Sequence, residues 1–229
     1  MYTQLALATF GLVASAAALP VAGNDKPSGS WPAQNGAEVV SYTAKFDNVE
    51  AGLVGSLPVR PVTPLGVYDD LFFNLNVINV GTGLTGVKPQ SAPNVVTYDA
   101  IFQATEGVPS IYADYDDSIA ESFRLKELYF GCVITNVETA ASVANDCTVT
   151  VTGYRNEEQV ASQDIVFKTG GLLGQAVTAT MDKAEFGSDF ANLDKVEFAT
   201  DGLQQAVDAV LIDNVSYEVT LKQGMSQSY

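Results

Sequence analysis

The sequence contains no histidine, and it has one tryptophan and two cysteines among its 229 residues. The lack of histidine excludes Ser-His-Asp and Cys-His catalysis, histidine general bases and histidine-ligated metals. Basic residues are also few, since 11 Lys and Arg stand against 27 Asp and Glu, a formal charge of −16. Phosphate backbones and anionic lipids repel such a polyanion, so we expect neither nucleic acid nor a membrane surface as a partner. Solubility and tolerance of a mildly acidic exterior explain the acidity, and a specific role in cation binding is the alternative.

A run of 18 or more apolar residues is absent beyond the N-terminus. The N-terminus itself has an apolar run of signal-peptide length followed by small residues, although no positive charge precedes it. We therefore expect a secretory signal over residues 1–18 and an extracellular protein, with a membrane anchor as the alternative. Residues 19–36, which include Trp31, should form a flexible arm, because they are rich in Gly, Pro, Ser and Asn. Residues 37–222 should form one β-sandwich domain and residues 223–229 a polar tail.

Two-residue alternation of apolar and polar side chains is the main pattern of the chain, and no sustained helical period occurs. Residues 148–152 alternate Thr and Val, residues 155–158 are polar, and residues 160–167 alternate again. This pattern predicts a β-hairpin. The apolar parity changes between Leu125 and Leu128, which indicates a β-bulge between them.

Other segments also have the composition of strands. We expect strands at residues 38–48, 68–80, 94–102, 175–181, 194–200 and 206–221, a loop at 111–117 and a connection with a short helical turn at 182–192. About ten short strands joined by turns predict an all-β fold, and a jelly-roll β-sandwich is our first choice. Gly81, Gly83 and Gly86 match the GxGxxG pattern formally, but no helix pattern follows, so we interpret them as part of a turn.

Cys132 and Cys147 are the two cysteines, and in a secreted chain they should form a disulfide with each other. A bond that closes a loop of this length stabilises the fold by about 3 kcal/mol. Two free thiols are the alternative.

Asp213 interrupts the apolar face of the last predicted strand. A carboxylate there must be hydrogen-bonded, paired or bound to a metal. First and last strands commonly lie side by side in jelly rolls, which would place Asp47 and Asn48 beside Asp213 and offer oxygen ligands to a structural calcium ion. A bulge that turns Asp213 outward, or a carboxylate that accepts backbone N–H bonds, are the alternatives. Asn214 begins the one N-x-S/T sequon and has polar parity, so it is a candidate glycosylation site.

Two segments combine aromatic rings with carboxylates. Their candidate ligand-binding residues are Tyr68, Asp70 and Phe72 in the first segment and Tyr112, Asp114, Tyr115 and Asp116 in the second. Aromatic rings stack on the apolar faces of sugars, and carboxylates accept hydrogen bonds from hydroxyl groups. Solvated loops and core aromatics have the same composition and are the alternative interpretation.

Several motifs together resemble those of a group of secreted, mostly fungal proteins. They are FDN at 46–48, YDDLFFNLNVIN at 68–79, SAPNVVTYDA at 91–100, the GC segment at 131–132 with CTVTVTGY at 147–154, and LIDNVSYEV at 211–219. The match spans most of the mature chain. The resemblance implies a β-jelly roll distantly similar to carbohydrate-binding modules, from a largely uncharacterised group, and it implies fold and secretion more directly than an activity.

The leading hypothesis is a secreted, non-catalytic, monomeric jelly roll that binds cell-wall polysaccharide. The first alternative is a glycoside-active enzyme with paired carboxylates, a weakly specific signal because 27 acidic residues supply many pairs. The second alternative is a secreted effector that acts on a host protein. Structural calcium is the one cofactor hypothesis.

Overall fold

The computed structural model describes residues 30–32, 37–53, 63–80, 86–135, 142–170, 178–200 and 208–226. The expected signal sequence and most of the glycine-rich turn lie outside these residues. The strands are β1 (Ser30–Pro32), β2 (Glu38–Ala44), β3 (Gly52–Leu53), β4 (Thr63–Tyr68), β5 (Leu71–Asn79), β6 (Val87–Lys88), β7 (Asn94–Asp99), β8 (Ser110–Tyr112), β9 (Ala120–Thr135), β10 (Ser142–Ala144), β11 (Cys147–Arg155), β12 (Glu158–Phe167), β13 (Ala179–Thr180), β14 (Asp182–Glu185), β15 (Lys195–Thr200) and β16 (Asp208–Leu221). The described helices are α1 (Ala100–Glu106) and the 3-10 helix η1 (Ser188–Phe190).

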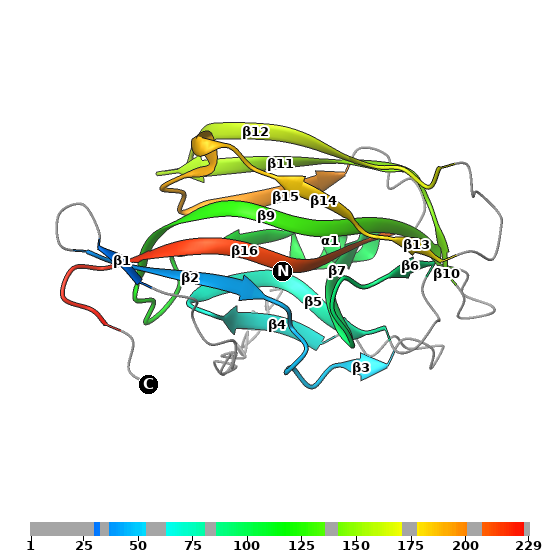
Figure 1. Ribbon diagram of the computed structural model, residues 1–229, viewed down its shortest axis with the longest axis horizontal. Helices are drawn as coiled ribbons and strands as arrows, with labels where there is room; N and C mark the ends of the chain where they lie inside the picture. Colours follow the sequence, from blue (N-terminus) through cyan, green and yellow to red (C-terminus); the bar gives the residue numbers. More distant parts are fainter. Residues whose placement is uncertain are drawn as a thin grey trace, which may run out of the picture.

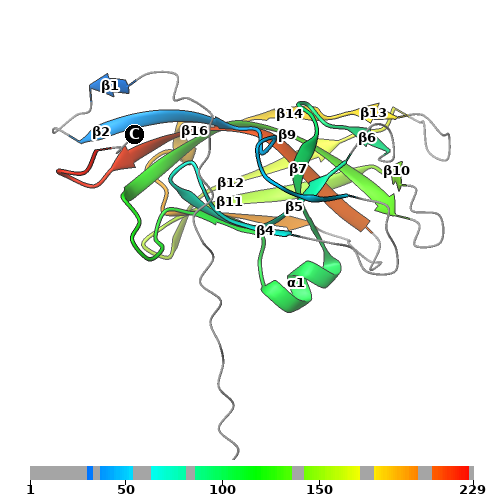
Figure 2. The ribbon, with the colours of Figure 1, turned by 90° about the horizontal axis from the view of Figure 1, so that it is seen from below.

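Most of these strands form one continuous sheet that curls into two layers (Figures 1 and 2). One layer contains β2, β16, β9 and β14, and the other contains β4, β5, β8, β15, β11 and β12. Strand β7 joins the layers because it pairs with β16 on one side and with β5 on the other. Large side chains from both layers, such as Phe130 and Phe198, fill the space between them. This arrangement confirms the predicted all-β jelly-roll sandwich.

The predicted β-hairpin is present as β11 and β12. Val149 and Val151 are fully buried, as the alternation requires. Asn156 and Glu157 make the turn, and both have positive φ angles, 50° and 66°. Two such residues in succession form the type I′ turn whose twist matches that of the flanking strands.

The predicted bulge is also present, in β9. Ser216 pairs with Glu127 and Tyr217 with Leu125, so Lys126 is the extra residue. The neighbouring strand β16 also has an extra residue, between Asp213 and Ser216, which offsets the extra residue in β9. Asn214 lies in this part of β16 and has a φ of 47°.

Strand β16 changes its partner on one side at this point. Its first half pairs with β7, its second half pairs with β2, and β9 runs along its other side throughout. The expectation that the strand at residues 38–48 lies beside the last strand is therefore confirmed.

Four segments differ from the sequence prediction. The strand expected at 94–102 ends at Asp99, whose carboxylate accepts a hydrogen bond from the amide of Phe102 at 2.8 Å and so caps α1. The loop expected at 111–117 begins within β8, because its first residues pair with β5 and β15. The connection expected at 182–192 contains the helical turn η1 but also β14, which pairs with β9. The arm expected at 19–36 includes β1, which pairs with β2.

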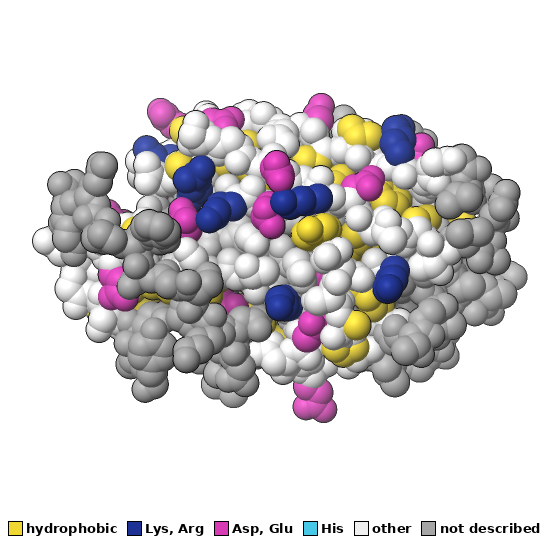
Figure 3. Space-filling model, in the orientation of Figure 1, with side chains coloured by type: hydrophobic (Ala, Val, Ile, Leu, Met, Phe, Trp, Pro, Cys, Tyr) yellow, Lys and Arg dark blue, Asp and Glu magenta, His cyan; other side chains and the backbone are white. Residues whose placement is uncertain are grey.

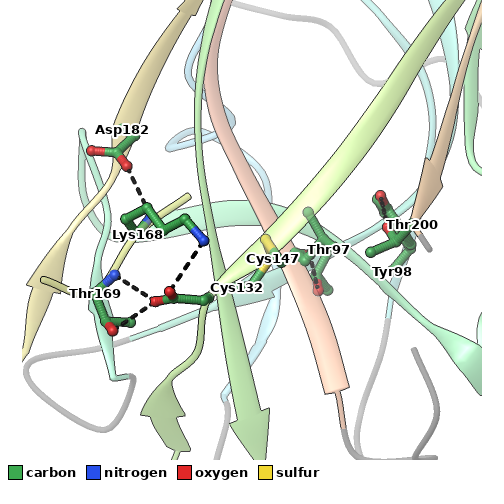
Figure 4. The surroundings of a disulfide bond; sticks show 10 residues. Thr97, Tyr98, Cys132, Cys147, Lys168, Thr169, Asp182 and Thr200 are labelled. Carbon is green, nitrogen blue, oxygen red and sulfur yellow. Dashed lines mark hydrogen bonds and ion pairs between the residues drawn. A yellow bond between two sulfur atoms is a disulfide. The ribbon is translucent and has the colours of Figure 1, made fainter. Parts of the chain in front are cut away.

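Cys132 and Cys147 form the predicted disulfide, with their Cα atoms 6.1 Å apart. The bond joins β9 to β11 and therefore ties one layer to the other. Next to it, the Asp146 carboxylate accepts hydrogen bonds from the amide and hydroxyl of Thr169. The Lys168 ammonium lies 3.3 Å from the same carboxylate (Figure 4). Within the described parts of the chain, no helix has the length and apolarity to cross a membrane.

Candidate ligand-binding site

Phe72 and Tyr112 form the centre of the candidate site. They stand directly opposite each other on β5 and β8. Their rings are stacked, with centroids 4.8 Å apart and planes 21° from parallel. Their neighbours in sequence, Leu71, Phe73 and Ile111, point into the core. Because strand side chains alternate, Phe72 and Tyr112 lie on the outer face of their layer, half-buried.

Tyr115 extends this pair from the loop after β8. Its ring centroid is 6.3 Å from that of Phe72. Burial, with a smaller contribution from the nearby Asp70 carboxylate, raises the pKa of the Tyr115 hydroxyl. The three rings and Asp70 therefore form one cluster, which unites both predicted segments.

The turn between β4 and β5 holds Asp70 in this cluster. Asp69 and Asp70 both have positive φ angles, 47° and 64°, as a two-residue turn requires. The Tyr217 hydroxyl donates to the Asp69 carbonyl at 3.0 Å, and the Tyr42 hydroxyl donates to the Asp70 carboxylate. Burial raises the pKa of Asp70, and the bond from Tyr42 opposes this effect.

The remaining predicted residues lie elsewhere. Tyr68 is fully buried in the core, where its ring contacts Phe46 and its hydroxyl donates to Asn48 at 2.8 Å. It is therefore not part of the surface cluster. Asp114 and Asp116 are exposed in the loop that carries Tyr115.

Two residues that the sequence interpretation did not include continue the line of Phe72 and Tyr112. Lys195 on β15 pairs with Tyr112, and Tyr154 on β11 pairs with Lys195. The Lys195 ammonium lies 4.7 Å from the centroid of the Tyr154 ring. Their polar parity is visible in the sequence, but their alignment with Tyr112 depends on the order of the strands.

The outer face of the opposite layer has a different character. Ion pairs cross it between β9, β14 and β16, with Lys126 3.0 Å from Glu218 and Lys183 2.8 Å from Glu127. Figure 3 shows this face, on which Lys and Arg are mixed with Asp and Glu. The described aromatic cluster thus belongs to the other layer.

Asp213 is fully buried at the point where β16 changes partner. Its carboxylate accepts hydrogen bonds from the amides of Ser91 and Asn214, each at 2.7 Å. Burial raises its pKa to about 7, the two backbone bonds oppose this shift, and the Asp47 carboxylate adds to it. Backbone N–H groups therefore satisfy this carboxylate, as one of the alternatives anticipated.

Of the residues suggested as calcium ligands, Asp47 lies close enough to Asp213 to raise its pKa, whereas the Asn48 side-chain oxygen accepts a hydrogen bond from the Tyr68 hydroxyl. Asp47 accepts from the Asn94 amide at 3.1 Å, and the Asn94 side chain donates to the carbonyls of Phe46 and Val49. The Asn94 Oδ1 atom is buried and has no hydrogen-bond partner among the described residues. The described residues contain no group of three acidic, Cys or His side chains suited to a metal. The donors present are carboxylate and amide oxygens, the type that calcium prefers.

Asn214 is half-buried, and its side-chain oxygen accepts a hydrogen bond from the Ser91 hydroxyl at 2.8 Å. The sequon therefore lies at the change of partner in β16 rather than in an extended loop.

Comparison with known proteins yields no matching family model and no matching curated protein. Among solved structures, the chain is similar to a DUF4465 family protein from Bacteroides caccae, with 13% identity, a TM-score of 0.48, and coverage of 80% of this chain and 99% of that one. The arabinose-bound α-L-arabinofuranosidase MgGH51 has 12% identity and a TM-score of 0.38, and the match covers 90% of this chain but 34% of that one. The K2 cleaved adhesin domain of Lys-gingipain has 13% identity and a TM-score of 0.31, with coverage of 80% and 98%.

Proposed function

We propose that this protein is a secreted, non-catalytic carbohydrate-binding protein and that the cluster of Phe72, Tyr112, Tyr115 and Asp70 contacts the glycan. The observation that carries the proposal is the group of three half-buried rings, two on the outer face of the sheet and one from the loop after β8. Rings in such a position provide apolar area at little cost in conformational entropy, and Asp70 provides a hydrogen-bond acceptor. The exposed Asp114 and Asp116 lie close enough in the chain to contribute further acceptors.

The charge and the disulfide support the same proposal. A net charge of −16 favours a neutral polymer over an acidic one. A disulfide between the layers suits an oxidising compartment, in keeping with secretion. Cellulose, chitin and β-glucan are neutral cell-wall polysaccharides of this kind.

We also propose that a calcium ion binds beside Asp213, with Asp47, Asn48 and Asn94 as neighbouring ligands. The supporting observation is the buried Asn94 Oδ1 atom, which lacks a hydrogen-bond partner among the described residues. The proximity of Asp47 and Asp213, two like charges, is the second. A bound cation would supply positive charge to both carboxylates and a partner to the amide oxygen.

Depletion of the purified protein from solution by insoluble cellulose, chitin, xylan and β-glucan, with and without calcium, tests the binding function. We expect one polymer to retain the protein and Phe72→Ala to lose that retention. A Val166→Ala variant is the control, because Val166 is exposed on the same layer but opposite Thr148, far along β11 from the aromatic cluster. Failure of all four polymers to retain the protein would contradict the proposal and favour a protein partner. Release of reducing ends would instead indicate a glycoside-active enzyme.

A further inference from the structure

A single transverse row of side chains crosses four strands on the outer face of the second layer. Phe72, Tyr112, Lys195 and Tyr154 occupy consecutive positions in this row, on β5, β8, β15 and β11. All four side chains are partly exposed. Adjacent strands lie about 4.8 Å apart, so the row extends about 14 Å from Phe72 to Tyr154. That length exceeds the width of a single sugar ring.

A lysine lies between the two aromatic ends of the row. Phe72 has ring neighbours in both Tyr112 and Tyr115. Lys195, which lies between Tyr112 and Tyr154, directs its ammonium group over the Tyr154 ring. The row therefore has an aromatic group at each end, separated by an aliphatic lysine stem.

A polar row runs parallel to the aromatic row. Its members, two residues away from the aromatic row on each strand, are Asn74, the buried Ser110, Glu197 and Thr152, and Thr152 pairs in turn with Ser162 on β12. The side chain of Asn74 already has a hydrogen-bond partner, because its amide donates to the carbonyl of Val108 at 3.1 Å. Thr152 and Ser162 have hydroxyl groups at the end of the row near Tyr154, where the Glu197 carboxylate is paired with Lys195. A ring row beside a hydroxyl-binding row matches a sugar chain, which has apolar ring faces and polar edges.

The positive charge of Lys195 in the aromatic row is balanced by the negative charge of Glu197 in the polar row. Lys195 lies 2.7 Å from Glu197, so its ammonium group already has a carboxylate partner. Glu197 also hydrogen-bonds with the Tyr154 side chain. With this pairing the row presents no unbalanced positive charge to attract an acidic polymer, and it suits a neutral ligand.

We infer that a neutral oligosaccharide binds across strands β5, β8, β15 and β11, with Phe72 and Tyr112 forming one subsite and Tyr154 a second. This inference rests on the proposed carbohydrate-binding function and adds to it the shape and charge of the ligand. It also assigns Tyr154 and Glu197 to the site.

Calorimetric titration with a short and a long oligosaccharide tests the inference. The probes are the disaccharide and the hexasaccharide of the polymer that retains the protein, for example cellobiose and cellohexaose for cellulose. We expect the wild-type protein to bind the hexasaccharide at least about tenfold more tightly than the disaccharide, equivalent to about 1.4 kcal/mol. Tyr154→Ala should remove this advantage without changing disaccharide affinity, whereas Phe72→Ala should weaken both.

Two further variants make the result specific. Tyr154→Phe keeps the ring and should keep the preference for the long ligand, while Val166→Ala should behave as the wild type. Thermal unfolding of each variant shows whether the fold is intact. Unchanged hexasaccharide affinity in Tyr154→Ala would overturn the second subsite but leave Phe72-dependent binding in place. Binding that does not depend on Phe72 would overturn the proposed site, and a complete lack of polymer binding would overturn both.

Discussion

Phe72 and Tyr112 stack face to face across two neighbouring strands, at a separation of 4.8 Å. Both strands of the pair have further partners in the sheet. Strand β5 also pairs with β4 and β7, and strand β8 also pairs with β15. The positions of the rings are therefore fixed by the sheet rather than by a loop. The two rings do not have to be ordered when a ligand binds, which lowers the entropic cost of binding.

The first prediction concerns this pair. Tyr112→Ala should reduce retention on the bound polymer about tenfold, or about 1.4 kcal/mol, because the aromatic surface is lost. The half-buried position means that the fold should persist, as circular dichroism can check. Tyr112→Phe keeps the ring and should retain binding. Full retention by Tyr112→Ala would show that the ligand binds elsewhere.

The second prediction concerns the calcium proposal. Asp213→Asn should lower the melting temperature in EDTA, because the single amide oxygen can replace only one of the two carboxylate oxygens that accept from Ser91 and Asn214. The loss should be larger in the presence of calcium, because the ion loses a carboxylate ligand. Asp164→Asn is the control, since Asp164 is exposed on β12. Equal losses with and without calcium would refute the metal site.

The third prediction concerns the hairpin turn. Glu157 has a φ of 66°, a conformation that costs a side chain with a Cβ about 1 kcal/mol or more and a glycine almost nothing. Glu157→Gly should therefore raise the free energy of unfolding by about 1 kcal/mol, measured in urea. The adjacent Glu158→Gly, which falls within β12, should lower it. The same sign for both variants would contradict the assigned turn.

The fourth prediction concerns the disulfide. Replacement of Cys132 and Cys147 by serine should lower the free energy of unfolding by about 3 kcal/mol, from loop closure across a separation of 15 residues. Urea unfolding of the wild-type protein in a reducing agent should give a similar loss. A double variant as stable as the oxidised wild type would show that the bond does not constrain the unfolded chain.

The fifth prediction concerns pH. Hydrogen bonds from the amide and hydroxyl of Thr169 lower the pKa of Asp146 below 3.8. The folded protein then binds this proton less readily than the unfolded chain, so the stabilisation is present above pH 3.8 and is lost as the pH falls below it. The difference in melting temperature between wild type and Asp146→Ala should shrink as the pH falls from about 6 to about 3. A difference independent of pH would contradict this assignment.

The regular strands could be predicted because their own side chains encode them. The alternation of Val149 and Val151 with threonines predicts a half-buried strand, and the parity change between Leu125 and Leu128 predicts the bulge. Helix α1 was missed, although Asp99 followed by Ala100 is a recognisable N-cap signal, because the preceding strand pattern appeared to continue.

The site was predicted in part for a related reason. Phe72, Tyr112 and Tyr115 are recognisable as aromatic residues near carboxylates, but their contact depends on the pairing of β5 with β8. Lys195 and Tyr154 lie far from them in sequence, and only the order of strands brings them into the same row. The burial of Tyr68 likewise follows from packing between layers, which the alternation of its own strand does not distinguish from exposure.

The central position of strand β16 determines when the sheet can be completed during folding. It is hydrogen-bonded to β9 along its length and to β7 and β2 in turn, so three strands remain with unpaired edges until it is in place. During synthesis, residues up to 207 leave the ribosome before this strand can join the sheet. Until Leu221 has emerged, the nascent protein exposes β-edges that are prone to intermolecular pairing, and a chaperone that shields them would increase the yield of native protein.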